Sequence, residues 1–431
     1  EWAGRCPDDA ELNYAARTVS LAAGLGIVIL VFALALKLFR SRESAWLAAG
    51  LVALNTACVT QSHYGTADMA YTFLLYLFLW LAWRMDEKKS RLQGFLAAFV
   101  AGCAMAVKFG PVLIPSLLML PFLLPRKREL PLLLFPFTVI LTFLGLQSFH
   151  FGRENLDMVW QMYLQDNVQT ATAAHLSNPL VYGFQLLRIL GLPVVALVVL
   201  FVPRVPSAFR QVRFTKGLIV GFLPILLHFI SILSAGLPFP RHLLPILPAF
   251  ILLAAGEWNS LTSGKRTSAI LVLGWSLLIT LSDQYAFRND SRAQADLWLA
   301  GQKTEGKTIW TDPYIKIPLA DRYRIAGLPG ADYVLRHEGW YHRFERSELS
   351  PLRKPHPSRL SHATSSDWAV HKRLEDEIAS GQRYVAFEAK PLLIMPEQWL
   401  YDKAWGSLEK FAGACVILAR RNEQANKWLL E

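Results

Sequence analysis

The sequence predicts an all-α polytopic membrane domain of about ten transmembrane helices, followed by a small soluble α/β domain. Two observations lead to this fold class. Apolar residues make up 53% of the 431 residues, and the mean hydropathy is +0.29, both above the usual values for a soluble globular protein. Apolar windows long enough to cross a hydrocarbon layer of about 30 Å recur over the first two-thirds of the chain.

The predicted spans are apolar runs of roughly 16 to 24 residues, and several contain Pro or Gly. They are approximately Val19–Phe39, Ala45–Thr60, Met69–Trp83, Phe95–Val107, Gly110–Leu124, Leu130–Gln147, Leu180–Val202, Gly217–Leu233, His242–Gly256 and Thr267–Leu281. We therefore assign residues 1–282 to the membrane domain and residues 283–431 to the soluble domain.

Basic residues near span ends predict which side each loop faces, because Lys and Arg are retained in the cytoplasm. One set of alternate loops holds about sixteen basic residues and the opposite set about five. The protein is thus predicted to be a multi-pass cell membrane protein, in the inner membrane if its source is Gram-negative, with Ser62–Asp68 and the C-terminal domain extracytoplasmic. These loops account for much of the net charge of +11, so we expect membrane lipids rather than nucleic acid as partners.

The composition becomes charged and mixed after about Ser282, which indicates a soluble module. Short runs of β-branched, aromatic and other apolar residues predict strands, and helical periodicity predicts two helices, the first with Ser291 as its N-cap. The strands are Lys307–Trp310, Tyr333–Leu335, Tyr384–Phe387 and Cys415–Ala419, and the helices are Ser291–Leu299 and Trp368–Ala379. In the outer segment Phe149–Pro179, helical spacing predicts an interfacial amphipathic helix or a helix packed on neighbouring loops.

The loop Ser62–Asp68 carries a histidine and an aspartate between two apolar runs, where ionisable residues are costly. Asp68 could act as a base, bind a metal ion, or cap the following helix. His63 could be a hydrogen-bonded structural residue or a metal ligand. A divalent metal therefore stays open as a cofactor, although one Asp and one His do not define a coordination set.

Three basic residues lie in or beside apolar runs. Lys108 lies between two spans that predict a hairpin, where it could snorkel to the interface or meet a lipid phosphate at headgroup depth. Arg241 lies among prolines that break a helix, and its guanidinium suits bidentate phosphate recognition. Arg188 is a weaker candidate, since it could only pair or snorkel. Such a cluster suits chemistry on a lipid-linked phosphate.

Four motifs together resemble the integral-membrane C-type glycosyltransferases, in the branch related to protein O-mannosyltransferases and lipid A aminoarabinose transferases. They are Arg17-Thr18-Val19-Ser20, Ser62-His63-Tyr64 with Asp68, Ala106-Val107-Lys108-Phe109, and Arg241-His242-Leu243-Leu244-Pro245. The resemblance lies in their order and spacing over about residues 15 to 255. It implies an enzyme that moves a sugar from a polyprenyl-phosphate donor to a lipid, glycan or protein acceptor on the outer face.

The resemblance also implies roles for individual residues. Lys108 and Arg241 would hold the donor phosphate, and Asp68 would orient donor, acceptor or a metal ion. The donor-binding set then comprises Lys108, Arg241, Arg188, Tyr64 and His242, and the catalytic set comprises Asp68 and His63.

One feature of the family has no match here. Its members place the usual catalytic acidic residue in the first outer loop, and Asp8, Asp9 and Glu11 lie too close to Arg17 to match it, so they are only fallback candidates. We therefore expect an N-terminally truncated sequence that lacks a first span, its outer loop and the catalytic base.

Two other classes of protein would share part of this sequence pattern. A catalytically inactive lipid-sugar-binding or scaffold member would keep the donor cavity without the first-loop carboxylate. A lipid transporter or flippase would also place charges in spans, but it should show an internal repeat or paired broken helices. Neither signal is visible in the sequence, so a membrane glycosyltransferase is the favoured function.

Overall fold

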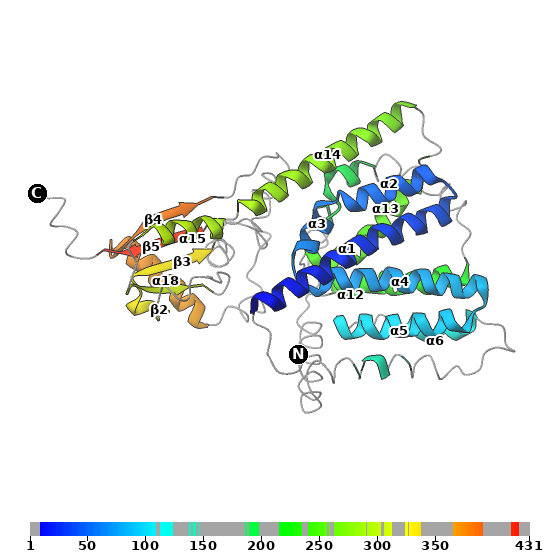
Figure 1. The fold of residues 1–431 in the computed structure, drawn as a ribbon, viewed down its shortest axis with the longest axis horizontal. Coiled ribbons are helices and arrows are strands. Elements are labelled where there is room, and N and C mark those ends of the chain that lie inside the picture. The colour runs from blue at the N-terminus through cyan, green and yellow to red at the C-terminus, as the bar shows by residue number, and fades with distance from the viewer. Residues whose placement is uncertain are drawn as a thin grey trace, which may run out of the picture. The chain divides into compact units, whose positions relative to one another are not determined.

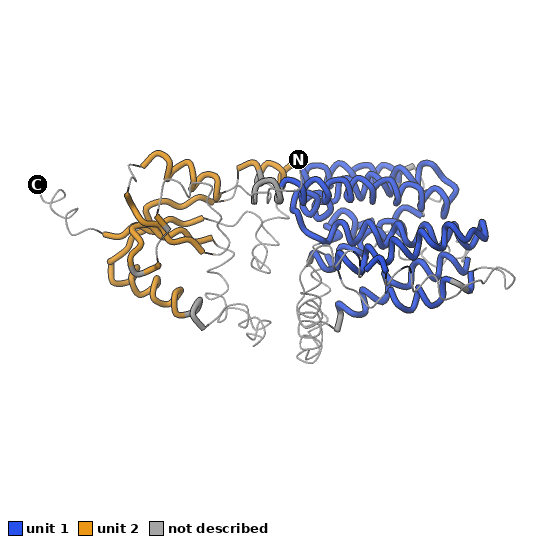
Figure 2. The backbone as a smooth tube through the Cα atoms, turned by 60° about the horizontal axis from the view of Figure 1, so that its bottom comes forward, with its two compact units in different colours: residues 1–280 blue, residues 281–431 orange. Residues whose placement is uncertain are grey.

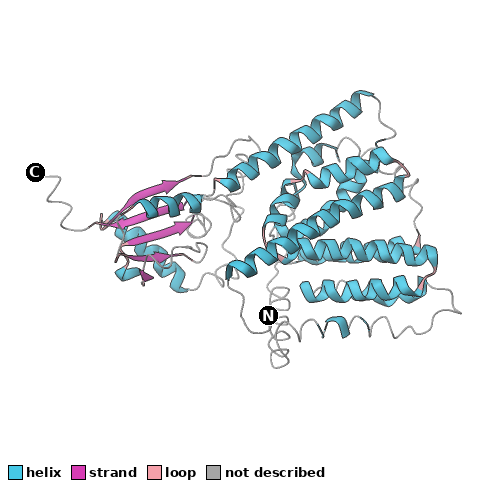
Figure 3. Cartoon of the chain, viewed as in Figure 1, coloured by secondary structure: helices cyan, strands magenta, loops and turns pink. Residues whose placement is uncertain are grey.

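The computed structural model describes part of the chain, and its elements form two compact units, Glu1–Thr280 and Leu281–Glu431 (Figure 2). The described residues are 9–108, 113–123, 138, 141–143, 145, 186–187, 189–197, 215–234, 240–256, 258, 263–289, 291–302, 306–312, 324–325, 327–337, 365–390 and 415–421. Within these ranges, the strands all belong to unit 2, and unit 1 is built from helices (Figure 3). The assignment of residues 1–282 to a membrane domain and of residues 283–431 to a soluble domain stays a prediction.

The described elements of unit 1 are helical, as the apolar runs predict (Figure 1). They are α1 (Asp9–Phe39), α2 (Arg42–Ala53), α3 (Thr56–His63), α4 (Ala67–Lys88), α5 (Arg91–Val107), α6 (Ile114–Met119), η2 (Leu120–Leu123), α12 (Lys216–Ser234), η7 (Pro240–Ile246), α13 (Leu247–Gly256) and the larger part of α14 (Ser263–Arg288), whose last residues belong to unit 2.

Two described helices are long and apolar enough to cross a membrane, Tyr14–Phe39 and Arg266–Tyr285. The bent pair α3 and α4 adds a third span if both helices are counted as one, and α5, α12 and residues 241–256 are shorter apolar helices. Several predicted spans fall wholly or partly outside the described residues, as does the predicted amphipathic helix within Phe149–Pro179. The prediction of about ten spans is therefore confirmed only as a helical, apolar fold.

Helix α4 is the centre of unit 1, because α1, α5 and α12 all pack on it. Its approach to α12 is close: a Cβ added to Gly221 would lie 2.8 Å from the Cα atom of Leu79, and one added to Gly217 would lie 2.9 Å from the Cα atom of Trp83. Glycines four residues apart allow helix backbones to meet in this way in a membrane. The N–H of Gly217 also donates to Asp86 at 2.7 Å, so α12 begins on a carboxylate of α4.

The predicted span Ala45–Thr60 is wrong as a single helix, because the chain breaks between α2 and α3. Asn55 is the N-cap of α3: its side-chain oxygen accepts from the N–H of Cys58 at 3.1 Å. Its amide also donates to the carbonyls of Ile189 and Leu190, at 3.0 and 3.1 Å. A polar residue that satisfies backbone groups of two segments therefore sets this break.

Unit 2 is a five-stranded sheet with a helix on each face. The strand order is β2-β1-β3-β5-β4, in which β1 pairs in parallel with β2 and β3, and β5 is antiparallel to β3 and β4. Apolar residues of α15 pack on one face of the sheet and those of α18 on the other. The elements are α15 (Ser291–Gly301), β1 (Thr308–Thr311), β2 (Arg324–Ile325), η9 (Leu328–Gly330), β3 (Tyr333–His337), α18 (Ser365–Ala379), β4 (Arg383–Ala389) and β5 (Cys415–Arg420).

The four predicted strands and both predicted helices of unit 2 are present. Strand β2 was not predicted, because two residues are too few to form a recognisable apolar run. Ser291, the predicted N-cap, is the first residue of α15.

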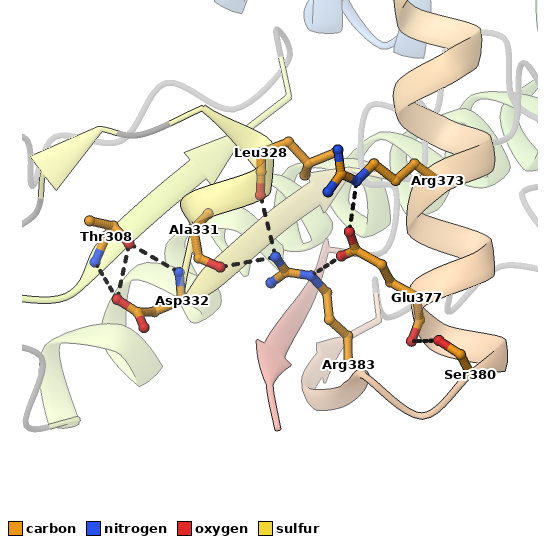
Figure 4. A network of polar contacts seen from close by, with 8 residues as sticks. All are labelled: Thr308, Leu328, Ala331, Asp332, Arg373, Glu377, Ser380 and Arg383. Atoms are coloured by element: carbon orange, nitrogen blue, oxygen red, sulfur yellow. Dashed lines mark hydrogen bonds and ion pairs between the residues drawn. The ribbon is translucent and has the colours of Figure 1, made fainter. Parts of the chain in front are cut away.

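A buried arginine ties α18 to the start of β4 and to η9 (Figure 4). Arg383 is 3% exposed; it donates to Glu377 at 2.6 Å and to the carbonyl of Ala331 at 2.9 Å. Burial alone raises the pKa of Glu377, but hydrogen bonds from Arg383 and Arg373 outweigh this effect and hold the pKa below its usual value. This network stabilises the ionised carboxylate and joins three elements of the module.

Candidate functional site

Asp68 lies between the two basic residues that the sequence singled out. The Nζ atom of Lys108 is 2.5 Å from its Oδ1 atom, and the Nε atom of Arg241 is 3.9 Å from its Oδ2 atom. The Asp68 side chain is 10% exposed, against 30% for Lys108 and 41% for Arg241. A nearly buried carboxylate thus faces two cations that remain partly open to their surroundings, and these three residues form the charged cluster of unit 1.

The three members of the charged cluster come from different elements. Asp68 lies in the first turn of α4, Lys108 is the C-cap residue of α5 with extended backbone angles, φ −149° and ψ 103°, and Arg241 is in η7. Because α4 packs on both α5 and η7, residues far apart in the sequence meet at the amino-terminal end of α4.

Asp68 does not cap α4, so that interpretation is wrong. The N-cap residue is Thr66, whose side chain makes no capping hydrogen bond and donates instead to Gln61 at 3.1 Å. Asp68 lies within the helix, where its negative charge is favoured by the helix dipole. Its carboxylate is therefore held by Lys108, Arg241 and the orientation of α4.

The predicted loop Ser62–Asp68 is shorter than expected. Helix α3 continues to His63, α4 begins at Ala67, and the two helices meet at an angle of 118°. Helix α1 supports this bend: Ser20 donates to the carbonyl of Thr66 at 3.2 Å, and a Cβ added to Gly65 would lie 2.6 Å from the Cβ atom of Ala16. The bend is thus packed against α1, which fixes the start of α4.

The other predicted site residues occupy different positions. His63, the last residue of α3, is exposed, and Tyr64 is the half-buried C-cap residue of that helix. His242 follows Arg241 directly in η7. Arg188 lies outside the described residues. The structure therefore places His242 beside the charged cluster and leaves His63 and Tyr64 at the neighbouring bend.

Two buried residues beside the charged cluster were missed in the sequence. The ring of His228, on α12, packs against the ring of Tyr71, on α4, with centroids 5.3 Å apart, and the Nζ atom of Lys108 lies 6.0 Å from the centre of the Tyr71 ring. The available signal was a histidine in the middle of the apolar run Gly217–Leu233, because an ionisable residue inside a span is a functional candidate by default.

A metal site is not supported by the described residues, among which no three His, Cys, Asp or Glu side chains gather as a set of ligands. The cations beside Asp68 also make it a poor ligand, because they repel a divalent ion. The same positive groups can attract an anion, and Arg and Lys both bind phosphate oxygens. The chemistry that this arrangement favours is electrostatic stabilisation of an anionic ligand next to a carboxylate.

Comparisons with known proteins agree with the motif pattern. Residues 8–150 match the model of the family described as dolichyl-phosphate-mannose-protein mannosyltransferase. The fold is similar to that of ArnT from Cupriavidus metallidurans bound to undecaprenyl phosphate, with a TM-score of 0.52, 12% identity, and coverage of 93% of this chain and 83% of that one. The apo state of the same protein gives a TM-score of 0.49 and 13% identity over the same shares. No curated protein matches the chain.

The family match covers α1 to η2, including Asp68 and Lys108, and the structural likeness shows the fold over nearly the whole chain. Together they confirm the resemblance that the motifs indicate, which is to the integral-membrane C-type glycosyltransferases.

Proposed function

We propose that the protein is a membrane glycosyltransferase that moves a sugar from a polyprenyl-phosphate donor to an acceptor on the extracytoplasmic face. The observation that carries this proposal is the charged cluster, in which Lys108 and Arg241 flank Asp68 at 2.5 and 3.9 Å. Such a group of charges at the end of an apolar helix bundle is costly unless a ligand uses it.

The net charge of the cluster fits the proposed donor. Two cations and one carboxylate leave a formal charge of +1, and a sugar joined to a lipid through a phosphodiester carries about −1. Binding would therefore neutralise the site. When the bond between the anomeric carbon and the phosphate oxygen breaks, the leaving phosphate gains negative charge, which Lys108 and Arg241 would stabilise without a covalent intermediate.

The acceptor must lose a proton as its oxygen or nitrogen bonds to the anomeric carbon. Asp68 would orient the acceptor or the donor beside the cations, and a carboxylate base would take this proton. The family resemblance implies that this base comes from a first outer loop. His63 and Tyr64, at the bend between α3 and α4, would line the approach to the site.

Two comparisons support the donor class. The matched family is described by dolichyl-phosphate mannose, and the similar ArnT structure holds undecaprenyl phosphate. Both are polyprenyl phosphates. The outward orientation of the site rests on the unequal distribution of basic residues among the loops.

The proposal is tested by sugar transfer from labelled polyprenyl-phosphate sugars, catalysed by the full-length protein in membranes. Lys108→Met and Arg241→Gln are each expected to lower turnover on the order of 100-fold, as the loss of one group that stabilises a leaving anion typically does. Lys37→Met is the matched control, because Lys37 makes an ion pair with Glu87 at 2.6 Å outside the charged cluster.

Wild-type turnover in both cluster variants would contradict the proposed site. A wild-type protein that binds polyprenyl phosphate but transfers no sugar would instead favour the inactive binding or scaffold class.

A further inference from the structure

The segment that carries Arg241 is held in place by two buried side chains. His228 contacts the carbonyl oxygen of His242 through its Nε2 atom at 3.0 Å, and the hydroxyl of Tyr76 donates to the carbonyl of Pro245 at 3.0 Å. A carbonyl oxygen only accepts hydrogen bonds, so the Nε2 atom of His228 must carry the proton. One donor comes from α12 and the other from α4.

These contacts matter because η7 lacks some of the N–H donors that its own carbonyl groups need. It is a 3₁₀ helix that begins at Pro240 and contains Pro245, and proline supplies no N–H group. A buried carbonyl without a partner is costly in apolar surroundings. The two side chains meet this need at different places: His228 at the residue next to Arg241, and Tyr76 four residues away from it.

His228 is also linked to the second cation of the charged cluster. Its ring packs against Tyr71, which is 1% exposed and lies under the ammonium group of Lys108. A displacement of the His228 ring would therefore disturb the support of both cations. Tyr76 instead supports the segment at Pro245, four residues along η7 from Arg241.

We propose that His228 is a positioning residue, which holds Arg241 in its place for donor phosphate through the hydrogen bond to the carbonyl of His242. This inference rests on the proposed function. Its role is distinct from that of Tyr76, which stabilises the same segment without setting the position of the guanidinium group.

The test compares three variants of the full-length protein in membranes. His228→Phe keeps an aromatic ring against Tyr71 but removes the donor, His228→Gln places an amide donor near the position of Nε2, and Tyr76→Phe removes the other donor. We measure KM for a polyprenyl-phosphate sugar, kcat, and the midpoint of thermal unfolding in the same preparations.

His228→Phe is expected to raise KM about tenfold, which corresponds to about 1.4 kcal/mol, and His228→Gln should return KM to within about threefold of wild type. Tyr76→Phe should lower the unfolding midpoint while KM stays near the wild-type value. The inference is overturned if His228→Phe leaves KM unchanged, or if Tyr76→Phe raises KM as much as His228→Phe does.

Arg241→Gln separates a failure of this inference from a failure of the proposed function. If Arg241→Gln binds and uses the donor as wild type does, the proposed function of the charged cluster fails, whatever the His228 variants show. If Arg241→Gln raises KM and His228→Phe does not, only the positioning role fails. The double variant His228→Phe/Arg241→Gln should be no worse than Arg241→Gln alone, because His228 acts through Arg241.

Discussion

The ion pair between Lys108 and Asp68 allows a quantitative test of how the charged cluster is held together. At 2.5 Å, two unit charges attract each other by about 7 kcal/mol at an effective permittivity of about 20. Desolvation of the two groups takes back several kcal/mol, and Lys108 keeps 30% of its side chain exposed. We therefore expect a net coupling of about 2 kcal/mol, near the upper end of measured pairwise values.

The perturbation is a double-mutant cycle with Lys108→Met and Asp68→Asn. Lys108→Met leaves Asp68 with Arg241 alone, and Asp68→Asn leaves two cations without a carboxylate. Each single substitution should cost about 2 kcal/mol of unfolding free energy. The double variant removes both charges and should cost no more than either single one. Chemical unfolding of the full-length protein in mixed micelles, followed by tryptophan fluorescence, measures all four proteins.

Additive costs would refute this account, because they would mean that the contact does not stabilise the fold. Donor turnover measured on the same proteins gives an independent result. The double variant should recover stability without recovering sugar transfer, since it lacks both the carboxylate and the ammonium group.

Three further predictions concern helix packing in unit 1 and the polar network of unit 2. Gly221→Val should lower the unfolding free energy by about 1–3 kcal/mol, because its Cβ atom would lie 2.8 Å from the Cα atom of Leu79. Gly274→Ala should have little effect, because the space around Gly274 is open. Equal losses in the two variants would show that the close approach of α12 to α4 does not limit side-chain size. The stability that Glu377 contributes is complete above its unfolded-state pKa and is lost as the pH falls through its lowered native pKa, which places the loss in the acid range below about pH 5. Limited proteolysis of unit 2 should therefore become faster in acid. The Glu377→Gln variant should not show this acid sensitivity. Arg383→Lys should raise the rate of proteolysis of unit 2 at neutral pH, because an ammonium group cannot reach both the carboxylate and the carbonyl oxygens that the guanidinium contacts. An unchanged cleavage rate would show that these contacts add no stability.

Much of the fold follows from local sequence patterns. The apolar run of α1 and the continuous apolar run of β5 predict those elements directly, because a helix that can span a membrane and a strand covered on both faces each require such a run. The break at Asn55 was missed because a hydropathy window averages over a single polar residue. Asn is a favoured N-cap, so the residue itself carried the signal.

The candidate site could be predicted as a set of residues but not as an arrangement. Asp68, Lys108 and Arg241 stand out because each is a charge in or beside an apolar run. Their convergence depends on which helices are neighbours, and no local pattern encodes that. His228 and Tyr71 were missed because neither carries a fixed charge, although a histidine inside an apolar run is itself a functional candidate.

The length of α4 gives the protein an internal measure of membrane thickness. Asp68 and Asp86 are 18 residues apart on this helix, which corresponds to about 27 Å at the helical rise of 1.5 Å per residue. That distance is close to the roughly 30 Å of the hydrocarbon core of a bilayer. A thicker or thinner membrane would therefore force the helix to tilt or the lipid to deform, and would change the depth of Asp68 relative to the phosphate groups of the surrounding lipids.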